Sequence, residues 1–171
     1  MKRTLSILLL LCLMFATAGC MPVDKGANQK ITFYYRSGNI DYEDGEKIFR
    51  TEERSVNTKN TDLAGIVRLY LSGPQDDSLV ASFPAGTTLV DLQLEEMNIT
   101  VILGGSYASL SGHEKTLACA FLTMTLCPIA NVPQLTVLAE NDPPDSDKGI
   151  VMRPENFVFT DDSKIPIEEN Q

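Results

Sequence analysis

The strongest hydrophobic pattern lies in residues 111–127, where it predicts a helix. Ser111 and Glu114 have the spacing of a capping box, in which two side chains satisfy backbone N–H groups of the first turn. Most of the following positions are apolar, and a helix that is apolar on most sides has to be covered on most sides. We therefore expect a central helix, packed between a sheet and a second element or a partner, and we expect Pro128 to end it. Its clearest face, at i, i+3, i+4 and i+7, comprises Leu117, Ala120, Phe121 and Met124.

Alternating apolar and polar positions predict the strands. The alternation covers residues 30–37, 48–56, 89–94, 99–103 and 135–139, and short edge strands are expected at 150–152 and 157–159. The third and fourth strands flank a short turn and predict a hairpin, with Val90, Leu92 and Leu94 on one face. Strand 48–56 carries charge on both faces, which is typical of an edge strand that avoids random pairing.

A second helix is expected between residues 61 and 73. Thr61 is the expected cap, and Asp62 suits the positive end of the helix in the first turn. Gly73-Pro74 supplies the end of the helix. The apolar positions with helical period are Leu63, Ile66, Val67 and Tyr70.

The order of elements predicts an α+β fold. Strand, strand, helix, strand, strand, helix, strand fits a single small domain, in which a mixed or antiparallel sheet carries two helices on one face. We expect this domain over residues 30–160 and a flexible acidic tail over 161–171.

The N-terminus predicts a cleaved leader and a lipid anchor. Lys2 and Arg3 precede a short apolar run, and Thr17-Ala18-Gly19-Cys20 resembles a bacterial lipobox. This predicts a lipoprotein signal peptide over residues 1–19, acylation (such as palmitate) at Cys20, and a tether over residues 20–29 that hangs the domain on the outer face of the cell membrane. The alternative is an ordinary secretory signal with an accidental cysteine.

The charge balance excludes some partners. The chain has a net charge of −9, and removal of Lys2 and Arg3 with the leader leaves 12 basic residues against 23 acidic ones. Binding to nucleic acid requires a basic surface, and so does polybasic binding to anionic lipid, so we expect neither kind of binding.

Few residues offer catalytic chemistry. Cys119 and Cys127 lie eight residues apart on the predicted helix, or about 12 Å, which is too far for a disulfide. We expect both to be buried small apolar residues. His113 is the only histidine, and it lies beside Ser111 and Glu114 in one helix start, where side chains do not converge as a triad does. We therefore expect no enzyme and no cofactor.

Two acidic loops and one aromatic strand are the remaining candidate ligand sites. Residues 38–45 and 141–149 are rich in Asp and Glu, but neither has the spacing of an EF-hand loop, so solvated turns are expected and weak Ca²⁺ binding stays open. Phe33, Tyr34 and Tyr35 share a strand; an exposed aromatic row there would suit glycan, whereas core packing is the more ordinary explanation.

An ordered set of short motifs resembles the GerMN domain of bacterial sporulation and germination lipoproteins. The set comprises Glu53-Arg54-Ser55-Val56, Ser72-Gly73-Pro74, Phe83-Pro84-Ala85-Gly86-Thr87, Thr125-Leu126, Val132 and residues 135–138. It covers roughly residues 30–140, and no single motif in it is specific. The chain departs from the family pattern at residues 101–104 and 139–141, and it has room for one such domain where the sporulation protein GerM has two. The resemblance implies a fold similar to ring-building motifs and a non-enzymatic role in assembling envelope complexes.

Two hypotheses follow. The first is a membrane-tethered interaction module that offers a sheet edge or a helix flank to envelope proteins or to other copies of itself. The second is a ligand-binding lipoprotein that recognises cell-wall glycan or a small solute, and it requires a pocket with convergent polar groups and exposed aromatics.

Overall fold

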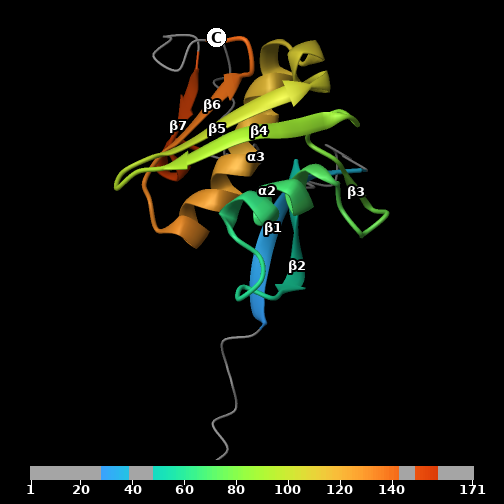
Figure 1. The fold of residues 1–171 in the computed structure, drawn as a ribbon. Helices are drawn as coiled ribbons and strands as arrows, with labels where there is room; N and C mark the ends of the chain where they lie inside the picture. The colour runs from blue at the N-terminus through green and yellow to red at the C-terminus, as the bar shows by residue number, and fades with distance from the viewer. Residues whose placement is uncertain (1–27, 39–47, 143–148, 158–171) are drawn as a thin grey trace, which may run out of the picture.

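The computed structural model describes residues 28–38, 48–142 and 149–157, which form two sheets and two α-helices (Figure 1). The elements are β1 (Gln29–Ser37), β2 (Phe49–Val56), α2 (Leu63–Leu71), β3 (Leu79–Val80), β4 (Thr87–Leu94), β5 (Ile99–Gly105), η1 (Ser106–Ser109), α3 (Gly112–Ala130), β6 (Leu135–Ala139), β7 (Ile150–Met152) and η2 (Pro154–Asn156). The predicted α+β class is confirmed.

The first sheet has the order β2-β1-β3 and is antiparallel. Strand β1 pairs with β2 from Gln29 opposite Val56 to Arg36 opposite Phe49 without a register shift. The alternation in β1 has the expected consequence: Ile31, Phe33 and Tyr35 are buried. Helix α2 supplies Tyr70 to this face, where its ring stacks on Tyr35 with centroids 4.9 Å apart.

The second sheet has the order β4-β5-β6-β7. Strands β4 and β5 form the predicted hairpin, β6 runs parallel to β5, and β7 returns antiparallel to β6. A parallel pair needs a crossover connection, and α3 provides it. Ile99, Val101 and Leu103 of β5 are fully buried.

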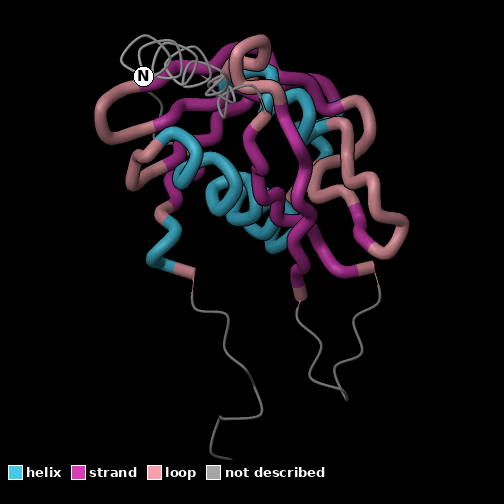
Figure 2. The backbone as a smooth tube through the Cα atoms, turned by 90° about the horizontal axis from the view of Figure 1, so that it is seen from below, coloured by secondary structure: helices cyan, strands magenta, loops and turns pink. Residues whose placement is uncertain are grey.

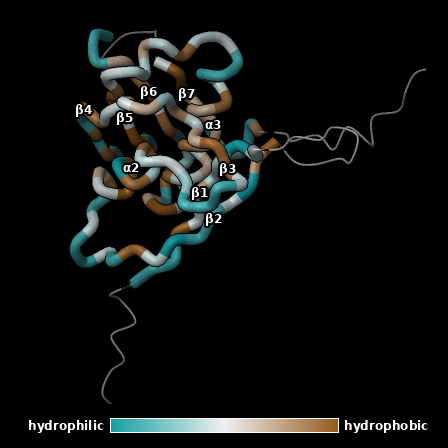
Figure 3. The backbone as a smooth tube through the Cα atoms, turned by 90° about the vertical axis from the view of Figure 1, so that its right-hand side faces the viewer, coloured by the Kyte–Doolittle hydropathy of each residue, from teal (hydrophilic) through white to brown (hydrophobic). Residues whose placement is uncertain are grey.

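Helix α3 is the centre of the molecule, as its sequence predicts. Seen from below, the helices lie in the middle with strands on both sides (Figure 2). Nine of its residues between Ala118 and Cys127 are buried, and hydrophobic segments gather around it, whereas β2 is largely hydrophilic (Figure 3). The strands therefore divide between two sheets instead of forming the single expected sheet, because a helix apolar all round needs apolar cover on two sides.

Both ends of α3 differ from the prediction. Ser111 is the N-cap by backbone position, but its side chain makes no capping hydrogen bond. Pro128 lies inside the helix, which continues to Ala130. The helix ends because Asn131 adopts the left-handed conformation (φ 55°) and the N–H of Val132 bonds to the Cys127 carbonyl oxygen at 3.1 Å.

Two further local predictions were wrong. Asp62, not Thr61, caps α2, and its carboxylate accepts a 2.7 Å hydrogen bond from the N–H of Gly65. In β4 the register shifts between Leu89 and Asp91, so the expected apolar face is interrupted. Val90 stands 53% exposed in this bulge, and Leu94 is 55% exposed near the hairpin turn.

Several predicted segments lie outside the described residues. They are the leader 1–19, Cys20, the tether up to residue 27, most of the acidic loops, residues 158–159 and the tail 161–171.

Candidate interaction surface

Strand β2 leaves one backbone edge open. The N–H of Ser37 bonds to the carbonyl oxygen of Ile48 at 2.9 Å, which fixes the residues whose backbone groups face β1. Because the orientation alternates along an antiparallel strand, the N–H and C=O groups of Thr51, Glu53 and Ser55 face away from β1. These three residues are exposed, and no described element lies beyond them (Figure 1).

The three other sheet edges of the described structure each carry a device that hinders pairing. Strand β4 is bulged at Val90, and the N–H of Leu92 donates to the Asp91 carboxylate at 2.9 Å. Strand β7 has three residues and is soon followed by Pro154, and β3 has only two residues. Strand β2 has eight residues, no bulge and no proline, so its edge is the best formed of the four.

A buried arginine holds β2 against the end of α2. Arg54 is 7% exposed, and its guanidinium donates to the carbonyl oxygens of Gly73 at 2.6 Å and Leu69 at 3.2 Å. It also lies over the ring of Phe33, 4.9 Å from the centroid. Free carbonyls at a helix end need donors, and the planar fork of Arg supplies several at once. Arg54 therefore fixes β2 to the end of α2, while the outer backbone edge of the strand stays unpaired.

Glu52 compensates the charge of Arg54. Its carboxylate accepts from Arg54 Nε at 2.7 Å and from the N–H of Gln75 at 2.9 Å. Burial raises the pKa of the Glu52 carboxyl, but these hydrogen bonds outweigh it and hold the pKa below its usual value. Burial also raises the pKa of the Tyr35 hydroxyl, which accepts from Arg54 at 3.2 Å, to about 12.

A groove of about 230 Å³ runs between the end of β1 and the start of α3. Its polar rim comprises Arg36, His113 and Glu114, and its apolar lining includes Phe83, Leu117 and Phe121. His113 is exposed, and no serine hydroxyl is bonded to it in the described structure.

The aromatic strand does not form an exposed row. Phe33 and Tyr35 have no exposed surface, and Tyr34 is half-buried with its ring 5.8 Å from that of Phe49. The backbone N–H of Tyr34 donates to Thr125 of α3 at 3.1 Å. Core packing therefore explains this segment.

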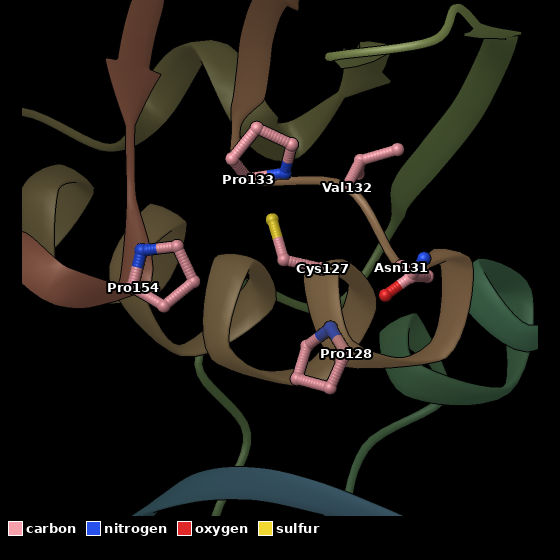
Figure 4. A pocket seen from close by; sticks show the side chains of 6 residues that line it. All are labelled: Cys127, Pro128, Asn131, Val132, Pro133 and Pro154. Carbon is pink, nitrogen blue, oxygen red and sulfur yellow. The ribbon is translucent and has the colours of Figure 1, made fainter.

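Cys119 and Cys127 are free and buried, as predicted. Burial raises the pKa of each thiol to about 11, so both are protonated near neutral pH. The Cys127 sulfur points toward Pro133 at an open hollow of about 400 Å³ (Figure 4). The lining of this hollow comprises Cys127, Pro128, Asn131, Val132, Pro133 and Pro154, none of which has a basic or charged side chain.

The described residues contain no group of three His, Cys, Asp or Glu side chains that would hold a metal ion. Within the same residues, no helix has the length and apolar character needed to cross a membrane.

The fold and the surface define a small α+β domain in which, among the described residues, the outer edge of β2 is unpaired. A family model described as Germane, sporulation and spore germination, matches residues 32–145. The chain therefore belongs to the Germane family. No curated protein matches it.

Solved structures agree with this assignment at the level of the fold. The tandem GerMN domains of the sporulation protein GerM from Bacillus subtilis match with a TM-score of 0.54 and 19% identity, over 74% of this chain and 43% of that one. The first GerMN domain of the same protein matches with a TM-score of 0.53 and 12% identity, over 66% of this chain and 84% of that one. The chain thus spans less than half of the tandem protein.

The sequence did not reveal two features of this surface. The sequence pattern predicts Arg54 as one charge of a half-exposed edge strand, whereas its side chain lies in the core. The arginine in the resemblance motif Glu53-Arg54-Ser55-Val56 was the only available signal. The second feature is the hydrogen bond from the N–H of Leu92 to the Asp91 carboxylate, which no sequence pattern predicts.

Proposed function

We propose that this chain is a membrane-tethered, extracytoplasmic interaction module that acts without catalysis in the assembly of an envelope complex, in sporulation or spore germination. The open edge of β2 is the observation that carries this proposal. An exposed strand offers main-chain hydrogen bonds to another chain, which is a common mode of protein recognition. Membership of the Germane family supports the biological setting.

The proposal includes lipidation of Cys20. The residues before Cys20 have the small side chains of a lipobox, and β1 begins at Gln29, nine residues later. A segment of that length reaches about 30 Å when extended. Membrane attachment would then keep the start of β1 within about 30 Å of the lipid surface.

The absence of catalysis is proposed from the state of the reactive side chains. Both described thiols are buried and have a raised pKa, and the exposed His113 has no nucleophile bonded to it in the described structure. Reactive cysteines sit instead in partly exposed, electropositive surroundings.

A pull-down from membranes of the native host tests the proposal. The tagged full chain is compared with a Cys20→Ala form, which cannot be acylated, and with Thr51→Pro, which removes one outward N–H of β2. We expect the full chain to recover a defined envelope protein, or more of itself, and Thr51→Pro to lose that partner. If Thr51→Pro recovers the same partner in equal amount, the edge of β2 is not the binding site. If the full chain recovers no partner, the proposal is overturned.

The groove beside α3 favours a second candidate, a ligand-binding lipoprotein for cell-wall glycan or a small solute. Its apolar lining and its rim of Arg36, His113 and Glu114 would suit a ligand with both apolar and polar parts. Retention of the full chain on purified peptidoglycan, with loss of retention in Arg36→Glu, would favour this candidate over the first.

A further inference from the structure

The open edge of β2 also has a sequence that is complementary to itself. We infer that its partner is a second copy of this chain, which pairs antiparallel along β2 with Thr51 opposite Thr51 of the second copy. The inference rests on the proposed function, because it names the occupant of the same edge. It would join the two three-stranded sheets into one continuous sheet.

The choice of register follows from which side chains would meet. Outward-facing backbone groups belong to Thr51, Glu53 and Ser55, so a symmetric antiparallel pair is centred on one of residues 51 to 55. A centre at Ser55 would pair only the end of the strand, because β2 ends at Val56. Centres at Glu52, Glu53 or Arg54 would each place a residue directly opposite the same charge, which destabilises a sheet. A centre at Thr51 places threonine against threonine, a favourable cross-strand pair.

The neighbouring residues then complement one another. With Thr51 at the centre, Arg50 lies opposite Glu52 of the second copy, and by symmetry Glu52 lies opposite Arg50 of the second copy. Arg50 is exposed. Glu52, whose pKa lies below its usual value, stays negatively charged near neutral pH while it accepts hydrogen bonds from Arg54 and Gln75, so it would attract Arg50 of the second copy by charge across the edge. The chain as a whole has a net charge of −9, so two copies repel each other unless opposite charges meet locally.

The edge geometry supports a partner that adds a strand rather than one that covers a face. Strand β2 pairs with β1 over eight residues without a shift, so its outer groups are spaced for a regular ladder. The exposed Lys30–Glu53 ion pair (2.9 Å) lies on the face of the sheet and leaves the backbone edge free.

The tethers permit this arrangement on one membrane. Gln29 pairs with Val56, so each tether leaves the sheet beside the end of β2. Antiparallel pairing around Thr51 places the two Val56 residues at opposite ends, about 33 Å apart along the strands. Each tether reaches about 30 Å, so both acyl groups reach one lipid surface when the strands lie along it. Confinement to that surface raises the effective concentration, so weak pairing in solution is sufficient.

Cysteine cross-linking of the full chain in membranes tests the register. Thr51→Cys would bring two thiols to Cα atoms about 5.5 Å apart, within the range that a disulfide bridges. Ser55→Cys is the matched control, because it has the same face and the same outward backbone but would lie more than about 20 Å from its copy. We expect a dimer band with Thr51→Cys under mild oxidation and none with Ser55→Cys. Equal cross-linking of both, or cross-linking of Ser55→Cys alone, would overturn the register.

Light scattering on the Cys20→Ala chain tests the pairing itself. We expect a reversible dimer that Arg50→Glu weakens roughly tenfold, because both symmetric charge pairs become repulsive. Circular dichroism confirms that the variant is folded. A monomer at concentrations up to about 1 mM, together with absent cross-linking in membranes, would overturn the inference. If the chain then still captures an envelope protein through β2, the proposed function survives and only the second copy is excluded; if it captures nothing, both fail.

Discussion

Arg54 Nε donates a 2.7 Å hydrogen bond to Glu52 Oε1, and both side chains lie on the inner face of β2, 7% and 11% exposed. The pair joins residues two apart on one strand, which is the spacing at which side chains share a face. It also ties the strand to the carbonyl oxygens at the end of α2. The inside of the open edge is therefore held by a buried ion pair.

Replacing Arg54 should cost much of the stability of the domain. Arg54→Ala leaves Glu52 as a buried charge without its cationic partner and removes a donor from the carbonyl oxygens of Leu69 and Gly73, so we expect a loss of about 3–5 kcal/mol in the free energy of unfolding. Urea denaturation measures it. The matched control is Lys30→Ala in the exposed Lys30–Glu53 pair (78% and 59% exposed), where the loss should stay within about 1 kcal/mol. Equal losses for the two pairs would contradict the assignment.

The same pair predicts an acid dependence. The pKa of Glu52 is lower in the folded chain than its usual value of 4.5, so the folded state gains stability from its ionisation. This stability is fully present above the unfolded pKa and is lost as the pH falls through the folded pKa. Stability measured from about pH 6 down to about pH 3 should therefore fall more steeply for the native chain than for Glu52→Gln. Parallel profiles would remove Glu52 as the cause.

Sequence patterns predicted those elements whose pattern is local. Strand β1 shows clear alternation, and α2 has helical period and a Gly-Pro end, so both were placed within one or two residues. The apolar surround of α3 predicted its central position, but the division of the strands into two sheets depends on pairings between distant segments. Nothing local specifies that β6 joins β5 in parallel.

The sequence predicted only part of the candidate surface, because the rest depends on contacts between segments that are distant in the sequence. The charges of β2 predicted an edge strand, and the structure confirms that position. The burial of Arg54 depends on the end of α2, which is distant in the sequence. The bulge at Val90 is equally hidden, because an extra residue in one strand is visible only against its partner.

A close backbone approach predicts that Gly105 cannot be replaced. Gly105 has φ +62°, and a Cβ atom there would collide with the carbonyl oxygen of Gly86. The matched control is Gly112, with φ +54° and nothing within 4 Å of the same position. We expect Gly112→Ala to cost about 1 kcal/mol from the backbone conformation alone. Gly105→Ala should lower the stability clearly more, because the backbone at Gly86, just before β4, must also move. Thermal or urea unfolding compares the stability of the two variants. Equal losses of stability would show that the Gly86 carbonyl oxygen does not restrict the side chain at position 105.

Thr125 predicts how strongly α3 is fastened to β1. Thr123 and Thr125 are both buried, and each hydroxyl donates to the carbonyl oxygen four residues earlier, at 2.7 Å and 2.9 Å. Only Thr125 also accepts a hydrogen bond, from the N–H of Tyr34 at 3.1 Å. Valine has nearly the same shape, so Thr125→Val leaves this N–H without a partner and should cost about 1–3 kcal/mol.

Thr123→Val is the matched control. It removes only a hydroxyl whose carbonyl acceptor is already bonded within the helix, so we expect a change within about 1 kcal/mol. Hydrogen exchange adds a local measurement: the amide of Tyr34 should exchange faster in Thr125→Val and stay protected in Thr123→Val. If the two variants lose equal stability and Tyr34 stays protected in both, the helix is held to the sheet by apolar packing alone. The expected result would instead mean that Thr125 binds one backbone N–H of β1, on the side of the strand that does not face β2.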